Sequence, residues 1–252
     1  MLAFTVARRI LTELWHTRRS LVGWAVFPAL MLLLFGLIYA DGVGGTPDSF
    51  NLMAPSILIG AALFFSCLGG PIAALVAERE RNTLKRLLLS PLGGTEYFIG
   101  VTLAHLVIAA GQVVIVYGIA FAFGGRFLGS LPLGVLIVAL SVTSYVGVGF
   151  FFGSRFAKRT EDVNGPVAAI GVPLLVLGGT FFPPSMLPPY LLSLAHLNPI
   201  FHMNEALDPV SADGLGWAAV QDHMIFLFLF AFLSIVLGAR SYRRMLAKER
   251  LL

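Results

Sequence analysis

Side chains that could perform hydrolysis gather in the last third of the chain. The candidates for a metal site or a Ser-His pair are Ser185, His196, His202, Asp208 and His223. His196 and His202 are six residues apart, so they do not share a face of one helix. The sequence has neither the His-Glu-x-x-His pattern of zinc hydrolases nor the Gly-x-Ser-x-Gly pattern of serine hydrolases. We therefore expect no catalytic residue and no metal site, and an enzyme is the weaker interpretation.

A nucleotide-binding loop is also missing from the sequence. The phosphate-binding pattern Gly-x-x-x-x-Gly-Lys-Ser/Thr does not occur, and the glycine-rich run at 42–45 lies between two long apolar stretches. The single cysteine, Cys67, cannot form an intrachain disulfide or a cysteine metal cluster. We expect no cofactor on this chain, so ATP and Mg²⁺ would bind a partner chain.

The most specific local pattern is the charged segment 78–93, which reads Glu-Arg-Glu-Arg-Asn-Thr-Leu-Lys-Arg-Leu-Leu-Leu-Ser-Pro-Leu-Gly. Asn82 can cap a helix or adopt the left-handed conformation, so one helix can end there and a short one can follow until Pro91. Leu84 and Leu88 would share a face of the short helix. Such a helix could bind a partner's groove or lie against its own bundle, and the spacing favours neither.

Long apolar stretches must position these segments. Crossing about 30 Å of hydrocarbon takes about 20 helical residues. The chain is 58% hydrophobic and 12% charged, with a mean hydropathy of +0.88, values typical of a membrane protein. Six spans are predicted at residues 21–40, 52–77, 97–123, 133–156, 163–182 and 223–240. The predicted fold class is an all-α polytopic membrane protein, with a single transmembrane permease domain over residues 1–252.

The basic residues predict how the spans are oriented. Of the 17 Lys and Arg residues, 16 lie on the face that holds both termini, and Arg126 lies on the other. With the acidic residues included, the first face has a net charge of +9 and the second of −5. By the positive-inside rule the termini are cytoplasmic. The basic character is therefore explained by loop bias and anionic headgroups, and no nucleic-acid partner is expected.

Residues 1–20 are predicted to form a helix that lies in the headgroup plane. Phe4, Ala7, Leu11 and Leu14 recur at three- and four-residue steps, and Trp15 is a suitable interfacial anchor. Arginines interrupt this stretch, and the apolar stretch that follows is long enough to span the bilayer, so a cleavable signal peptide is not expected.

The segment 183–222 is rich in proline and lacks Lys and Arg, and its continuous apolar runs are too short to span. It is nevertheless too apolar for an exposed loop. Short half-helices that re-enter the outer leaflet would bury its side chains. Such a segment could form an outer gate, with these residues: Phe182, Met186, Leu187, Tyr190 and Leu191.

Two segments resemble the type 2 ABC transporter permeases, the exporters of drugs, lipids and polysaccharides. The first is the charged run at 78–87 followed by Ser-Pro-Leu. The second is Gly-Gly-Thr-Phe-Phe-Pro-Pro-Ser-Met-Leu-Pro at 178–188, then Asn-Pro at 198–199 and Asn-Glu-Ala-Leu at 204–207. Both stand in the order and loops typical of the family. The family commonly has Gly where this chain has Asn82, which keeps access to the left-handed conformation.

The resemblance implies that the loop 78–93 contains a coupling helix that docks on a separate ABC ATPase subunit. The residues it assigns to this contact are Glu78, Arg79, Glu80, Thr83, Leu84, Arg86 and Leu88. It also implies two ATPase copies, a second permease copy as a homodimer or a heterodimer with a relative, export out of the cytoplasm and a bacterial cytoplasmic membrane.

A hydrophobic or amphipathic substrate, such as a drug, a lipid or a lipid-linked glycan, suits spans rich in Phe with almost no buried charge. A secondary transporter or channel-like protein without an ATPase is the alternative. Ion coupling needs ionisable residues inside the spans, and His105, Gln112 and a few hydroxyls are the candidates there.

Overall fold

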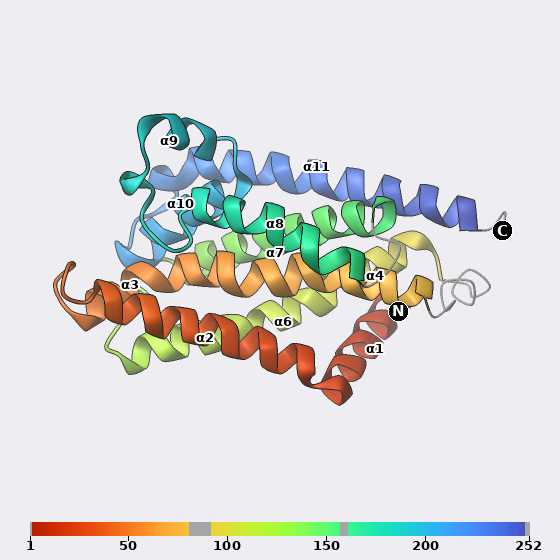
Figure 1. Cartoon of the computed structure of the whole chain (residues 1–252), viewed down its shortest axis with the longest axis horizontal. Coiled ribbons are helices and arrows are strands. Elements are labelled where there is room, and N and C mark those ends of the chain that lie inside the picture. Colours follow the sequence, from red (N-terminus) through yellow and green to blue (C-terminus); the bar gives the residue numbers. More distant parts are fainter. Residues whose placement is uncertain (1, 81–91, 157–160, 250–252) are drawn as a thin grey trace.

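The computed structural model describes residues 2–80, 92–156 and 161–249, and in these ranges the chain forms helices and turns without a β-strand (Figure 1). The longer helices run along one axis and form an elongated bundle. The predicted all-α class is confirmed. In chain order the helices are α1 (Leu2–Thr17), α2 (Arg19–Tyr39), α3 (Thr46–Ser56), η1 (Ile57–Gly69), α4 (Gly70–Glu80), α6 (Gly94–Ala122), α7 (Leu131–Arg155), α8 (Glu161–Leu177), η2 (Pro184–Met186), α9 (Pro189–Ala195), α10 (Pro199–Ala212) and α11 (Trp217–Glu249).

Five helices in the described part of the chain are long and apolar enough to cross a membrane. They are α2, the continuous helix Thr46–Glu80 made of α3, η1 and α4, and then α6, α7 and α11. A sixth helix, α8, has a shorter apolar stretch, Val167–Leu177. The chain is thus a multi-pass membrane protein, with each predicted span represented by a helix.

The fifth predicted span, 163–182, is wrong at its C-terminal end, because α8 ends at Leu177. The chain turns at Gly179, whose φ of 78° favours glycine. Downstream side chains satisfy carbonyl groups at this end of α8. Asn198 Nδ2 donates to Leu174 O at 2.6 Å, and Asn204 Nδ2 donates to Gly178 O at 2.7 Å.

The second predicted span, 52–77, is the middle of a helix that runs from Thr46 to Glu80. Its central part, Ile57–Gly69, is π-helical, and nearly all of its side chains are buried. The apolar window of this helix is 78% buried, against 17% for α2, so the second span is the centre of the bundle and the first lies at its edge.

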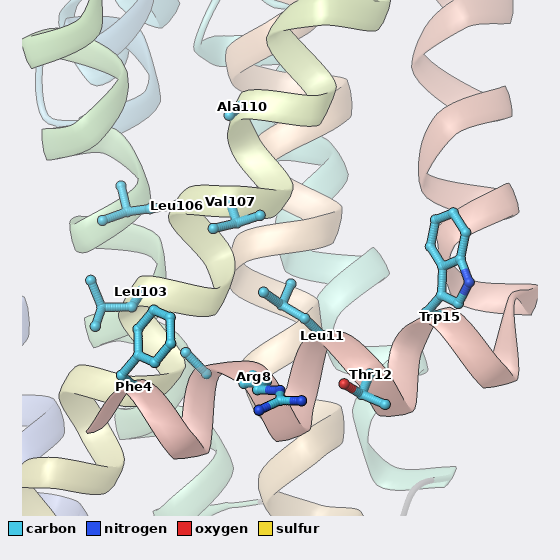
Figure 2. Close-up of a pocket in the computed structure, with 10 residues that line it drawn as sticks. Phe4, Arg8, Leu11, Thr12, Trp15, Leu103, Leu106, Val107 and Ala110 are labelled. Carbon is cyan, nitrogen blue, oxygen red and sulfur yellow. The ribbon is translucent and has the colours of Figure 1, made fainter. Parts of the chain in front are cut away.

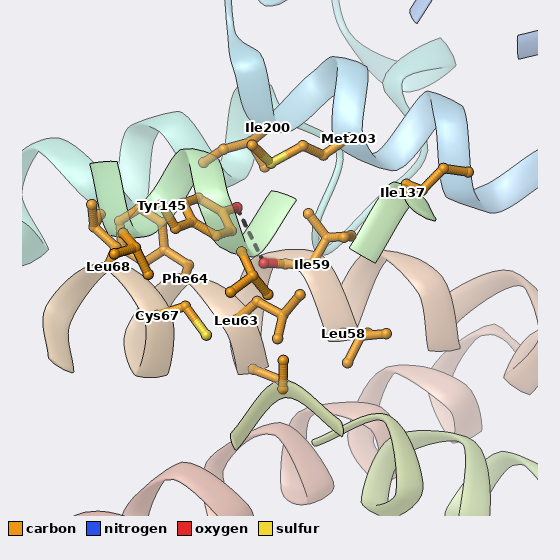
Figure 3. Close-up of a cluster of buried hydrophobic side chains, with 14 of the residues drawn as sticks. Leu58, Ile59, Leu63, Phe64, Cys67, Leu68, Ile137, Tyr145, Ile200 and Met203 are labelled. Carbon is orange, nitrogen blue, oxygen red and sulfur yellow. Dashed lines mark hydrogen bonds between the residues drawn. The ribbon is translucent and has the colours of Figure 1, made fainter. Parts of the chain in front are cut away.

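Buried apolar side chains join this central helix to α7 and α10 (Figure 3). The Tyr145 hydroxyl of α7 donates to Ile59 O of η1 at 3.2 Å. The helix α11 packs along α7, where the backbones meet closely. A Cβ at Gly238 would lie 2.5 Å from Gly147 O, so only glycine fits there. The helix α11 extends beyond the predicted 223–240 at both ends.

The helix α1 lies within the range 1–20, packs mainly on α6 and lies at an angle to the bundle axis (Figure 1), and its position in the headgroup plane stays a prediction. The N-terminus and the C-terminal end of the chain lie toward the same end of the bundle. We call this the base and the opposite end the outer end. The segment 183–222 lies at the outer end and contains η2, α9 and α10, none of which is long enough to span.

Candidate functional site

A buried carboxylate lies at the base of the bundle, in the last turn of α4. Glu78 is only 8% exposed. Arg9 Nη2 of α1 donates to Glu78 Oε1 at 3.1 Å, and the side chain of Tyr97 of α6 is a neighbour of the same carboxylate. Burying an ionised carboxylate is expensive unless it is paired and hydrogen-bonded. The ion pair therefore favours contact between α1 and the end of α4.

Aromatic side chains extend this cluster to two more helices. The rings of Tyr97 and Tyr242 stack with their centroids 5.4 Å apart. Phe150 of α7 meets the Tyr242 ring edge-on at 5.3 Å. Five helices, α1, α4, α6, α7 and α11, thus converge on a base cluster formed by Arg9, Glu78, Tyr97, Phe150 and Tyr242. Displacement of the end of α4 would therefore disturb the contacts of the other four helices with this cluster.

The predicted ATPase-coupling residues fall partly in the described chain. Glu78 is buried, Arg79 is partly buried and Glu80 is exposed. The remaining predicted residues, Thr83, Leu84, Arg86 and Leu88, lie outside the described residues. The sequence interpretation treated the three described residues alike, whereas the structure places Glu78 inside the protein. Its spacing of three residues from Leu75, which is buried on the same helix, was a usable signal.

The second motif is assembled at the outer end. Its parts, 178–180, Asn198 and Asn204, come together through the two bonds that complete the end of α8. The Asn198 side chain also accepts from Ile200 N at 3.0 Å and so caps α10. Tyr39 of α2 donates to Phe181 O at 3.4 Å. The motif therefore holds a break between two helices and ties it to α2.

The predicted gate residues lie along the connection from α8 to α9. Phe182, Leu187 and Leu191 are partly buried, whereas Met186 and Tyr190 are exposed. Movement of this segment stays a prediction.

The outer histidines form a contact between α10 and α11. His202 Nε2 donates to His196 O at 2.9 Å, which leaves His202 Nδ1 to accept from His223 Nδ1 at 3.0 Å. Burial lowers the pKa of His202, in keeping with this neutral form. Ser185 lies in η2 and is exposed. Among the described residues no group of three His, Cys, Asp or Glu side chains is arranged to hold a metal.

A groove of about 500 Å³ separates α2 from α8, with the central helix as its floor. The indole of Trp24 lines the groove. The rings of Phe27 and Phe65 also line it and pack edge to face, with their centroids 5.3 Å apart. The residues that line it are Ser20, Gly23, Trp24, Phe27, Ala61, Phe65, Gly69, Ala73, Val167 and Ala168. Its volume and mostly apolar lining are typical of sites for small molecules, whose volumes are about 300–1,000 Å³.

The described chain is thus a bundle of helices long enough to cross a membrane, with a lateral groove and a partly buried ion pair at its base. The family model described as "ABC-2 type transporter" matches residues 1–210, and the chain belongs to this family. The resemblance to type 2 ABC transporter permeases is thus confirmed.

Similar proteins occur in Escherichia coli K12 and in E. coli O157:H7, and both are named "Probable multidrug ABC transporter permease YbhR". Each is 32% identical to this chain over 133 residues, which is 52% of this chain and 36% of the relative. The matched part thus spans about a third of the length of these curated relatives.

Proposed function

We propose that the chain is the membrane subunit of an ATP-driven exporter whose ATP is hydrolysed by two copies of a separate ABC ATPase subunit. One observation carries the proposal. The continuous helix Thr46–Glu80 forms the floor of the groove and ends in the base cluster, at the first residues of the predicted coupling segment 78–93. The element that would contact the ATPase is therefore the element that would contact the substrate.

Coupling proceeds through the end of α4. Docking of the ATPase on residues 78–93 displaces this end when ATP binds. The ion pair of Glu78 with Arg9 makes α1 follow, because separation would leave a buried carboxylate without its cation, and α6 follows through Tyr97, which lies beside Glu78. The central helix then moves relative to α2 and α8, which changes the width of the groove.

A second permease copy completes the path. The helix α2 is poorly covered by its own chain, and α8 exposes Ile170 and Val172. The groove lies between these helices and is open on one side. A second copy, identical or related, that faces this side would convert two grooves into one enclosed passage.

The orientation follows from the charge asymmetry. The base, where both termini lie, faces the cytoplasm of a bacterium, and the outer end carries the net charge of −5 predicted from the sequence. In this orientation α1 lies in the cytoplasmic headgroup plane, with exposed Phe4 and Trp15 toward the lipid. The segment 183–222 then dips into the outer leaflet as the outer gate.

The substrate is hydrophobic or amphipathic. Trp24, Phe27 and Phe65 offer aromatic faces, and no charged side chain lines the groove. The name of the E. coli relatives, which specifies multidrug transport, supports a lipophilic compound. Export of a lipophilic fluorescent dye from membrane vesicles is therefore the appropriate assay.

The test fills the groove. Gly69 lines it, and a Cβ there would meet open space, as it would at Gly111 on α6, outside the groove. With the ATPase and the second permease copy present, Gly69→Phe should abolish ATP-dependent dye export, and Gly111→Phe should not. Equal transport by the two variants would remove the groove from the path. Export driven by a proton gradient without ATP would establish the secondary transporter instead.

The coupling contact has its own test. Leu84→Asp places a carboxylate in the proposed docking face and should uncouple ATP hydrolysis from transport while the permease still inserts, because desolvating an unpaired carboxylate costs several kcal/mol. Glu80→Ala should have the same effect to a smaller degree. A fully active double variant would show that residues 78–93 do not form this contact.

A further inference from the structure

A wedge-shaped cavity of about 690 Å³ lies between α1 and α6 (Figure 2). Phe4 and Trp15 stand toward its two ends, with Leu11 between them on α1, and Leu103 and Val107 face them from α6. The wedge shares no lining residue with the groove between α2 and α8. It is therefore a second site, separate from the proposed substrate path.

The wedge exists because α1 touches α6 closely near its N-terminus and then diverges. A Cβ at Gly100 would lie 2.6 Å from Val6 Cβ, so the two helices meet tightly there. Further along, Trp15 is 69% exposed and Val107 is 56% exposed, although both border the cavity. The apolar walls are thus left uncovered by the described part of the chain.

One cation lies among these apolar walls. Arg8 lines the wedge, and it forms no ion pair with another described residue, whereas the adjacent Arg9 is paired with Glu78. No carboxylate lines the cavity. Arginine binds phosphate through two parallel hydrogen bonds, so Arg8 offers an anion site beside an apolar space.

We propose that this wedge binds an anionic glycerophospholipid of the leaflet in which α1 lies. One acyl chain lies along Leu11, Leu103 and Val107, and the phosphate group binds Arg8. The lipid fills the space between α1 and α6 and so holds α1 where Arg9 reaches Glu78. A second copy of this chain is the poorer occupant, because it would bring a second Arg8 toward the first. The inference rests on the proposed placement of α1 in the headgroup plane.

The experiment measures the quenching of Trp15 by brominated lipid. With Trp24→Phe and Trp217→Phe, Trp15 is the sole tryptophan. The purified chain is reconstituted in vesicles containing phosphatidylglycerol or phosphatidylcholine with a dibrominated acyl chain at equal mole fractions. We expect phosphatidylglycerol to be preferred by about five-fold, the effect of one arginine near an anionic headgroup. Equal quenching of Trp15 by the two lipids would by itself overturn the proposal.

Two pairs of variants locate the site. Arg8→Gln should abolish the preference, and Arg19→Gln, which removes the same charge from the start of α2 outside the wedge, should keep most of it. Val107→Phe should fill the wedge and reduce quenching, and Val114→Phe, at an exposed position of the same helix, should not.

Equal effects of Arg8→Gln and Arg19→Gln would assign the preference to the basic surface and overturn the proposal. Equal quenching in Val107→Phe and Val114→Phe would do the same, as would displacement of the lipid by the transported dye. The assay uses neither the ATPase nor transport, so its failure is distinct from failure of the proposed function.

Discussion

The two ends of the bundle bury polar groups by different means. At the base, a carboxylate from α4 is paired with Arg9 of α1, so charge joins helices that are far apart in sequence. At the outer end, the neutral amides of Asn198 and Asn204 satisfy carbonyl groups at the end of α8. The base links helices that are separate in the sequence, whereas the outer amides hold a local break in the backbone.

One outer group departs from this pattern and gives the largest expected effect. Asp208 of α10 is mostly buried, and none of the described residues donates to its Oδ1. Burial, and then the neighbouring Glu205 and Asp213, raise the pKa of Asp208 from 3.8 to about 7. Because the folded state holds the proton more tightly than the unfolded state, stability is lost as the pH rises from about 4 to about 7.

Asp208→Asn should therefore stabilise the protein at high pH. Its advantage over the parent grows from about pH 4 to pH 7 and is constant above, at no more than about 4 kcal/mol. Thermal unfolding in detergent across this range measures it. Asp41→Asn, at an exposed carboxylate, should give no such trend. A pH-independent difference would show that the pKa of Asp208 is not raised in the folded state.

The amide network gives the next largest effect. Asn204→Leu removes the donor to Gly178 O at a site that is only 4% exposed, and should cost about 1–3 kcal/mol. Asn51→Ala removes an equally short bond, from Arg126 N at 2.6 Å, where water can replace it, and should cost less. Equal losses of melting temperature would show that the outer amides do not stabilise the break after α8.

The base ion pair is expected to contribute about 1–2 kcal/mol, less than a fully buried pair, since the Arg9 side chain remains 47% exposed. Arg9→Met alone leaves the carboxylate without its cation, and Arg9→Met with Glu78→Gln removes both charges. The double variant should therefore be more stable than Arg9→Met. A double-mutant cycle on the unfolding free energy measures the coupling. If the losses of unfolding free energy in the two single variants were additive, the ion pair would not contribute to the stability of the base cluster.

Much of the fold was predictable because about 20 consecutive apolar residues are a strong signal. The end of α8 was not, because it depends on Asn198 and Asn204, which lie 24 and 26 residues beyond the carbonyl groups they satisfy. The sequence contains these amides but does not show which carbonyl groups they bind.

The candidate site was predicted in parts. The segment 78–93 and the second motif at 178–207 were both predicted from their residues. The structure describes the whole of the second motif, but only residues 78–80, 92 and 93 of the segment 78–93. The pairing of Arg9 with Glu78 joins positions 69 residues apart, and the groove has walls on α2 and α8 with a floor on η1. Such sites depend on how helices pack, which no local pattern contains.

The smallest expected effect concerns the outer gate, and it distinguishes a moving outer end from a static one. Leu191 is partly buried in α9, and Asp213 is exposed. A thiol introduced at Leu191 should react slowly with an impermeant reagent in the nucleotide-free complex and change its rate by a small factor when ATP is trapped, while one at Asp213 should react quickly in both states. Full and constant reactivity at Leu191 would reject both re-entry and gating. Slow and constant reactivity at Leu191 would indicate that the segment is a static lid. The conformational change that starts at the base would then have to open the path at the aromatic side chains of the groove.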